Sequence, residues 1–409
     1  MFELVGKYNK AKVFTDTIEN STISHIQSFL NLECLEDSKI RIMPDCHDGK
    51  GCVIGTTMTI SDKVIPSVVG CDIGCGVLVV KLKEKRIDLP KLDSTIRKYV
   101  AIERTSEHKS LNEVGLDDLV CKKGDLKAVR LGFGTPGGGN HFIEIDKDEE
   151  SGDLYLVIHS GSRNLGIQVE KYYQDLAYEE TKTRELGGEY KDLVDELKKK
   201  LLAEGKKKEL GSEIARLKKK FSEYKTHLAY EVSYVSDKNF KDYIHDMEIA
   251  QRYAYLNRRV MADMILKEMK LHEVESFTTM HNYIDLDSMI VRKGAVSAKK
   301  DEQLIIPINM RDGSLLCIGK GNEDWNCSAP HGAGRLMSRS VAKSSLSVNE
   351  FKQTMKEAGV FSTCVGNGTI DEAPMAYKSM EDILNNVIDT VEVFKIIKPI
   401  YNFKSGEEE

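Results

Sequence analysis

The amino-acid sequence predicts an α+β fold in which mixed β-sheets surround a deep cleft, with helices on the outside and one protruding helical hairpin. Residues 1 to about 85 and 126–170 alternate short apolar runs with glycine and proline, a pattern typical of buried strands joined by functional loops. Residues from about 172 to 270 follow helical spacing instead. Residues 271–409 then return to strands and glycine-rich turns.

Short apolar runs locate individual strands in the first two regions. Arg41–Pro44 and Val77–Val80 are expected to be buried strands that end in functional loops. Leu154–Ile158 is expected to be a further strand, which delivers His159 at its end.

The charged middle of the chain predicts the hairpin. Apolar side chains recur at helical spacing at Leu193, Leu197 and Leu201, and again at Ile214, Leu217 and Phe221. Gly205 and Gly211 interrupt this pattern, so we expect two helices that fold back on each other. We place the hairpin as an insert at about 175–230 in a single domain that spans residues 1–409.

Three further helical features follow from spacing and charge. Lysines cluster at Lys198–Lys200, Lys206–Lys208 and Lys218–Lys220. These runs could contact phosphates, but the interleaved glutamates favour a merely solvated helical face. Met247–Met269 is expected to be a long, more buried helix, and a last helix is expected at about Glu381–Lys395, capped by Ser379.

Composition indicates a soluble globular protein, with 41% hydrophobic and 30% charged residues. The formal net charge of −6 shows no global basic footprint, so nucleic-acid binding would need a local basic groove. The start of the chain lacks the order of a signal peptide, and no run of about 18 residues is apolar enough to cross a membrane. We therefore expect a cytoplasmic protein whose nine cysteines are reduced, and any special cysteine to be a ligand or a nucleophile.

Histidines and cysteines recur in glycine-rich turns. The clusters are Pro44–Gly51, Gly70–Gly76, Gly137–Glu144, His159–Arg163, His281–Asn282 and His331–Arg335. Asp72 and Cys75 are three positions apart in a tight turn, so that a carboxylate and a thiolate could converge on one metal. Any one of these histidines alone is more often structural, but four in similar settings favour a shared metal site.

Three consecutive glycines, Gly137–Gly139, permit close approach of a phosphate to backbone N–H groups. They do not form a Walker loop, because no Gly-Lys-Ser/Thr follows, and they do not fit the dinucleotide-binding pattern. The residues alone therefore indicate a metal-dependent enzyme that acts on phosphates.

In order and type, the clusters resemble those of the tRNA-splicing ligase RtcB family. The resemblance covers nearly the whole chain, from Met43–His47 to Asp371–Lys378 and the terminal Lys404. Its specificity lies in the ordered set Asp-Ile-Gly-Cys-Gly, Gly-Gly-Gly-Asn-His-Phe-Ile-Glu, His-Ser-Gly-Ser-Arg, His-Asn and His-Gly-Ala-Gly-Arg.

The resemblance implies a centre of two manganese ions. Asp72, Cys75 and His141 match the ligands of one ion, and Cys75, His159 and His281 match those of the other, so that Cys75 bridges them. The mixture of oxygen, sulfur and nitrogen donors also suits Zn²⁺ or Co²⁺. Manganese therefore rests on the resemblance and not on ligand chemistry.

The resemblance further implies an RNA ligase that joins a 3′-phosphate end to a 5′-hydroxyl end. His331 matches a nucleophile that attacks the α-phosphate of GTP and holds GMP, a reaction open to a neutral imidazole at pH 7. GMP then passes to the RNA 3′-phosphate, which the 5′-hydroxyl attacks. A 2′,3′-cyclic phosphate would first be opened to a 3′-phosphate.

The residues that match GTP contacts in the family are Asn140, Phe142, Glu144, Asn282, Asn309, Ser314, Gly332, Ala333, Gly334, Tyr377 and Lys404. Glu144 would face guanine and favour GTP over ATP, Asn140 would lie on phosphate, and Tyr377 could stack on the base. Arg163 and Arg335 are candidate RNA-phosphate contacts.

One loop departs from the family. Where the family commonly reads Pro-Gly-Ser-Met-Gly, this chain reads Pro307-Ile308-Asn309-Met310-Arg311. Asn309 thus replaces a serine expected to contact GTP, although an amide can still donate or accept. Arg311 could grip phosphate, mark a subfamily with a different RNA end or activator, or be a neutral variant.

The sequence is also compatible with two other functions. A metal-dependent phosphohydrolase or nuclease could use the same cluster without a covalent intermediate, and a non-catalytic RNA-binding protein could keep the fold. His331 discriminates, because only the ligase needs a residue that GTP labels. Asp45 and His47 have three possible roles on the sequence: support of the metal site, contact with the RNA end, and structural packing. An archease-type activating partner is conceivable, and a monomer is expected.

Overall fold

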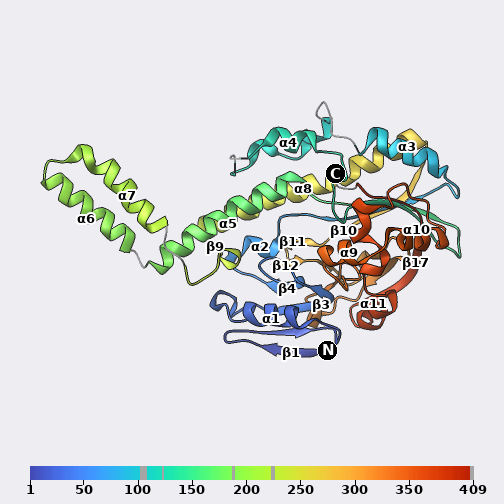
Figure 1. Cartoon of the computed structure of the whole chain (residues 1–409), viewed down its shortest axis with the longest axis horizontal. Coiled ribbons are helices and arrows are strands. Elements are labelled where there is room, and N and C mark those ends of the chain that lie inside the picture. The colour runs from blue at the N-terminus through green and yellow to red at the C-terminus, as the bar shows by residue number, and fades with distance from the viewer. Residues whose placement is uncertain (102–107, 122–123, 187–188, 223–225, 406–409) are drawn as a thin grey trace.

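The computed structural model describes residues 1–101, 108–121, 124–186, 189–222 and 226–405 (Figure 1). Within these ranges the chain forms two large sheets and two small ones, with helices around them. The predicted α+β class is confirmed. No helix in the described ranges is long and apolar enough to cross a membrane.

The larger sheet has seven strands, all antiparallel to their neighbours. Their order is β10 (Glu273–Met280), β6 (Gly76–Leu82), β8 (Leu154–Ser160), β7 (Phe142–Lys147), β17 (Val391–Phe403), β15 (Gly313–Gly319) and β14 (Gln303–Asn309). The predicted strands at Val77–Val80 and Leu154–Ile158 are confirmed as parts of β6 and β8.

The second sheet has six strands and one parallel pair, β2 with β3. Its order is β1 (Phe2–Val5), β2 (Lys10–Val13), β3 (Ile40–His47), β4 (Ile54–Thr59), β12 (Ile290–Lys293) and β11 (Asn282–Asp285). Two short pairs complete the strands: β5 (Lys63–Val64) with β9 (Val235–Ser236), and β13 (Ala295–Ser297) with β16 (Ser328–Pro330).

Antiparallel alternation in the larger sheet gathers four chain segments at one edge. Neighbouring antiparallel strands run in opposite directions, so β10 and β8 end where β6 and β7 begin. The register shows this directly, because His159 lies opposite both Val77 and Phe142, and Met280 lies opposite Gly76. The residues just outside these strand ends are therefore brought together by backbone pairing alone.

The helices are α1 (Asn20–Phe29), α2 (Pro66–Val69), α3 (Leu89–Tyr99), α4 (Leu126–Leu131), α5 (Asn164–Glu185), α6 (Glu189–Ala203), α7 (Leu210–Ser222), α8 (Asp237–Met269), α9 (Arg339–Ser345), α10 (Val348–Glu357) and α11 (Met380–Val387). The long buried helix expected at 247–269 is confirmed as α8, which begins earlier, at Asp237. Buried side chains at helical spacing, such as Met247, Ala250 and Ala254, pack α8 against β6, β8 and α5.

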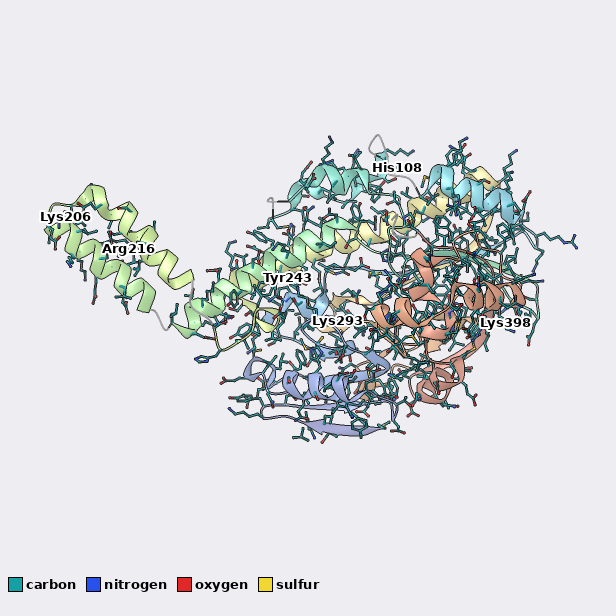
Figure 2. The ribbon with its side chains drawn as sticks, viewed as in Figure 1. His108, Lys206, Arg216, Tyr243, Lys293 and Lys398 are labelled. Atoms are coloured by element: carbon teal, nitrogen blue, oxygen red, sulfur yellow. The ribbon has the colours of Figure 1, made fainter. Side chains whose placement is uncertain are left out.

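Helices α6 and α7 pack against each other and project from the body beyond the end of α5 (Figures 1 and 2). The antiparallel hairpin of two helices matches the expectation, and Leu201 is one of its buried residues. The expected lower boundary near 175 lies inside α5, so the hairpin itself is narrower. The division into one domain with an insert stays a prediction.

The predicted last helix was too long. Ser379 caps α11 as expected, with its hydroxyl accepting from the Asp382 N–H, but the helix ends at Val387. From Val391 the chain runs as β17 between β15 and β7, with burial that alternates over its first residues. Residues 391–395 therefore follow the period of a strand, and pairing with β15 satisfies backbone groups that a helix would have bonded internally. The later residues Lys398–Phe403 pair with β7.

Candidate active site

A cavity of about 840 Å³ opens at the edge of the larger sheet where these strand ends meet. Its wall includes candidate metal ligands, the proposed nucleophile and much of the expected nucleotide pocket. The predicted residues on the wall are Asp72, Cys75, Asn140, Phe142, Glu144, His159, His281, Asn282, Asn309, His331, Gly332, Ala333, Gly334, Arg335, Tyr377 and Lys404. His141, Ser314 and Arg163 are outside the lining.

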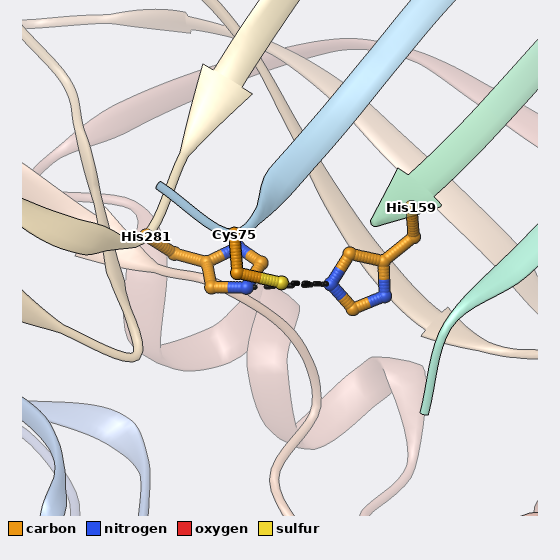
Figure 3. A group of neighbouring side chains, drawn as sticks. All are labelled: Cys75, His159 and His281. Carbon is orange, nitrogen blue, oxygen red and sulfur yellow. Dashed lines mark hydrogen bonds between the residues drawn. The ribbon is translucent and has the colours of Figure 1, made fainter. Parts of the chain in front are cut away.

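Five side chains converge at the base of this cavity. The Cys75 sulfur lies 3.2 Å from His159 Nε2 and 3.4 Å from His141 Nε2. His159 Nε2 is 3.3 Å from His281 Nε2, and His141 Nε2 is 3.0 Å from an Asp72 carboxylate oxygen. Figure 3 shows the Cys75 thiol between the rings of His159 and His281.

Two groups in this cluster have the geometry to hold a metal ion. In each of Cys75–His159–His281 and Asp72–Cys75–His141, the ligand atoms lie within 4.8 Å of one another. Cys75 belongs to both groups, so one thiolate would bridge two ions. These are the two ligand sets that the family resemblance implies, and their role as ligands stays a prediction.

Protonation in the cluster suits a cation. Burial lowers the pKa of His159 and of His281 well below the usual value, so both rings are neutral. The Nδ1 of His159 lies 3.2 Å from the Asn140 carbonyl oxygen, which assigns the proton to Nδ1 and leaves the Nε2 lone pair facing Cys75. Burial also raises the pKa of the Cys75 thiol well above its ordinary value. A divalent ion would reverse this last effect by displacing the proton.

Helix α8 holds the turns that carry these ligands. The Asn257 side chain accepts from the Gly134 and Thr135 N–H groups and donates to the Thr135 carbonyl and the Ser160 hydroxyl. The buried Arg258 guanidinium donates to the Gly74 and Ser160 carbonyls at 2.9 and 2.7 Å. These two residues were missed from the sequence, although adjacent polar residues inside a buried helix are a usable signal.

Asn257→Leu is expected to destabilise the fold by about 3 kcal/mol, because buried donors and acceptors on two loops would lose their partners. Urea unfolding followed by circular dichroism measures this loss. Tyr255→Ala, at a position on α8 that is 44% exposed, serves as the control and should change stability by less than about 0.5 kcal/mol. A change of similar size in both variants would contradict the assignment.

His331 is held in one orientation by the buried Asp45. The carboxylate accepts from His331 Nδ1 at 2.7 Å and from the backbone N–H groups of His331 and Gly332 at 3.1 and 3.2 Å. Nδ1 therefore carries the proton, and Nε2 keeps its lone pair. Gly334 has φ of +75° and lies so close to the Asp45 backbone that a Cβ would clash, which explains the glycine there. Asp45, unassigned from sequence, positions His331.

The far side of the cavity is a charged network around the buried Glu372. Its carboxylate accepts from Tyr377 at 2.6 Å and from Lys404 at 3.0 Å. It also pairs with Arg335 at 3.3 Å and Arg339 at 2.6 Å. The cations hold the pKa of Glu372 down, to about 2, against the opposing effect of burial. Arg339 also pairs with the Asp371 carboxylate at 2.6 Å. Three cations against two carboxylates still leave this wall net positive, which suits a polyphosphate.

Glu144 lies apart from that network, on β7. Its carboxylate accepts from the Asn402 amide at 2.6 Å, and burial raises its pKa to about 7. Asn282, expected to touch GTP, bonds to the Asp72 carbonyl and the Gly294 N–H, and so supports the ligand turn. Ser314 is fully buried on β15, beside the cavity-lining Gly313.

Arg163 and the variant loop with Arg311 also have clear positions. The Arg163 guanidinium lies against Gly137 in the glycine-rich loop. Arg311 donates twice to Asp312, at 2.7 and 2.8 Å, and is outside the cavity lining. Asn309 accepts from the backbone N–H groups of Arg311 and Asp312 and so stabilises the turn. Of the three hypotheses for Arg311, this pairing favours a neutral loop variant.

The sequence is similar to one known protein family over most of its length. The family model for tRNA-splicing ligase RtcB matches residues 29–133 and 95–405. The RNA-splicing ligase RtcB of Escherichia coli strain K12 is 30% identical over 413 residues, covering 88% of each chain. The tRNA-splicing ligase RtcB of Methanococcus maripaludis is 26% identical, covering 93% of this chain and 91% of that one. That of Aeropyrum pernix is also 26% identical, covering 86% and 85%. The chain therefore belongs to the tRNA-splicing ligase RtcB family.

Proposed function

We propose that this member of an RNA ligase family joins RNA ends bearing a 3′-phosphate or 2′,3′-cyclic phosphate to ends bearing a 5′-hydroxyl, using GTP and two Mn²⁺ ions. The observation that carries the proposal is the placement of His331. Its Nδ1 is bonded to Asp45, and it shares one cavity with both candidate metal groups. The His331 ring centre is 4.9 Å from that of His281.

The first step would use His331 as nucleophile. Its Nε2 forms a bond to the α-phosphorus of GTP while the bond to the bridging oxygen breaks and pyrophosphate leaves. The ring becomes cationic in this step, and the Asp45 carboxylate on Nδ1 offsets that charge. Divalent ions, when bound by the two candidate groups, would neutralise phosphate charge and favour the leaving pyrophosphate. Lys404 and Arg335 line the same cavity and would orient the polyphosphate.

GMP would next pass from His331 to the RNA 3′-phosphate, which restores the neutral imidazole. The 5′-hydroxyl of the other RNA end attacks the activated phosphate, and GMP leaves. Cytoplasmic location, a monomeric state and an archease-type activating partner stay predictions alongside this scheme.

The proposal is tested with two short RNAs, one ending in a 3′-phosphate and the other beginning with a 5′-hydroxyl, incubated with GTP and Mn²⁺. We expect a joined product that needs GTP and is absent when the ends are 3′-hydroxyl and 5′-phosphate. Loss of the terminal phosphate without joining, and without a need for GTP, would instead support the metal-dependent phosphohydrolase. The same assay with ATP measures nucleotide preference.

Glu144 predicts a pH dependence of GTP binding. Its ionised carboxylate could accept from N1–H and N2–H of guanine, and its pKa of about 7 means that ionisation is incomplete below neutrality. GTP affinity, measured by calorimetry, should therefore rise by about tenfold between pH 6 and pH 8. The ATP profile controls for titration of the triphosphate.

Glu144→Gln removes the titrating group and should flatten the extra pH dependence of GTP over ATP. Identical GTP profiles in the wild type and this variant would exclude a guanine contact by Glu144. Burial raises the pKa of Glu144 in the folded state to about 7, above its value in the unfolded chain. The free energy of unfolding should therefore fall as pH rises from the unfolded pKa to about 7. Binding is therefore measured well below the unfolding temperature.

A further inference from the structure

A second cavity, of about 260 Å³, adjoins the active-site cavity. This side pocket lies between residues 17–22, the end of β3 and residues 335–338. His47, Asp48, Arg335 and Ser338 line both cavities, so the two are neighbouring compartments with a shared boundary.

The end of β3 connects the side pocket to the proposed nucleophile. The Asp45 carboxylate bonds to His331, and the Asp45 carbonyl oxygen lies 2.9 Å from His47 Nδ1. The neighbouring Pro44 carbonyl accepts from Lys378, a residue of the side pocket, at 3.0 Å. A group held in the side pocket is thus separated from His331 by a single segment of strand.

The pocket combines apolar walls with a buried cation. Ile18, Leu336 and Met337 contribute apolar surface, and Leu336 is 51% exposed at the rim. The Lys378 ammonium is buried and donates to two carbonyl oxygens, from Thr17 and Pro44. No carboxylate in the described ranges lies within ion-pair distance of it, so its charge is available to an anion at the pocket.

One of the two acidic residues at this pocket already has polar partners in the protein. The Asp48 carboxylate accepts from the Thr22 hydroxyl at 3.3 Å and lies 3.9 Å from His25 Nδ1. Glu19 is exposed at the start of α1. An apolar slot with an ammonium behind it and a phosphate-binding cavity beside it suits a nucleoside whose adjoining phosphate points toward the cation.

We propose that the side pocket binds the terminal nucleoside of one of the two RNA ends. The inference rests on the proposed ligation, which needs two RNA ends and a guanine nucleotide near His331 at different stages. The main cavity already holds the candidate metal groups and the expected guanine contacts, so an RNA end needs a neighbouring compartment. The shared chemistry of both ends is a base and ribose with a phosphodiester, and the experiment separates the 3′ end from the 5′ end.

The test uses Leu336→Asp, which places a negative charge at the exposed rim without disturbing the interior. Val341→Asp is the matched control, because Val341 is 49% exposed on the nearby α9 and lines neither cavity. Leu336→Met keeps the apolar contact and should behave as the wild type. Three rates are measured for each protein: self-labelling by GTP, transfer of GMP to a 3′-phosphate strand, and joining of a guanylylated strand to a 5′-hydroxyl strand.

We expect Leu336→Asp to raise the KM for RNA by about tenfold. The rate of each RNA step is compared with the self-labelling rate of the same variant. A higher KM for RNA in the transfer step assigns the pocket to the 3′ end. A higher KM found only in the joining step assigns it to the 5′-hydroxyl end. An unchanged KM in both steps, or an equal rise in Val341→Asp, would overturn the proposal.

Binding of a fluorescent RNA strand, measured by anisotropy without GTP, keeps this test independent of the proposed function. If the wild type shows no self-labelling, the ligase proposal fails. Weaker RNA binding by Leu336→Asp alone would still support the side pocket in that case, and equal binding by all four proteins would overturn it.

Discussion

Asp45→Asn is expected to lower the rate at which GTP labels the protein by about 10²–10⁴-fold, the range typical when the orienting carboxylate of a reactive imidazole is removed. The carboxylate is fully buried and bonds to Nδ1 of His331 at 2.7 Å. An asparagine can still accept from the backbone N–H groups. It cannot offset the positive charge that develops on the ring when Nε2 attacks phosphorus.

Pre-steady-state labelling with α-³²P-GTP measures this effect, with GTP affinity measured separately. We expect the affinity to change by less than about threefold, since Asp45 faces His331 and not the nucleotide. Asp195→Asn, on the hairpin, is the matched exchange and should label at the wild-type rate. A fall of less than about tenfold in Asp45→Asn would mean that Asp45 serves packing alone.

Cys75→Ala is expected to abolish binding of both metal ions, because the Cys75 sulfur belongs to both candidate groups. His281→Ala removes a ligand from only one group and should retain one ion. Loss of the shared thiolate should weaken metal affinity at each site by at least about 100-fold. Mutation of a residue that only hydrogen-bonds to a metal ligand already costs about 10–100-fold in affinity. RNA joining should be undetectable in both variants.

Metal content after equilibrium dialysis against Mn²⁺ measures the stoichiometry directly. Cys34→Ala, at a half-buried cysteine of the N-terminal region, is the control and should bind as the wild type does. Because the pKa of Cys75 is raised by burial, metal binding must displace a proton, and the wild-type affinity should increase with pH. Two ions retained by Cys75→Ala would exclude a bridging thiolate.

Glycine-rich turns at strand ends predicted a shared metal site, and the family resemblance supplied the two candidate ligand sets. The structure brings these side chains together, and their role as ligands stays a prediction. The strand that ends at His159 was predicted from five apolar residues, and antiparallel pairing then explains how His159 meets Cys75. The partner of the proposed nucleophile, His331, could not be found in this way. Asp45 and His331 are 286 positions apart, and only the end of β3 beside β16 brings them together.

Tertiary pairing also explains the errors. The segment after Val387 has the local pattern of a continuing helix, but β15 pairs with Val391–Ile397 and β7 pairs with Lys398–Phe403, so the segment forms β17. Glu372 lay within the quoted Asp371–Lys378 motif, yet nothing local shows that Arg335 and Lys404 would converge on it. The sequence thus located the turns and, through the resemblance, the candidate ligands. The residues that hold those side chains in place could be identified only from the fold.

The most direct measurement is incubation of the wild type and His331→Ala with Mn²⁺ and α-³²P-GTP, followed by denaturing electrophoresis. Attack by Nε2 of His331 predicts an acid-labile labelled band in the wild type and none in the variant. A band that persists in His331→Ala would place the covalent bond elsewhere. No label in the wild type, with or without RNA and across several divalent metals, would contradict the ligase mechanism and favour metal-dependent hydrolysis.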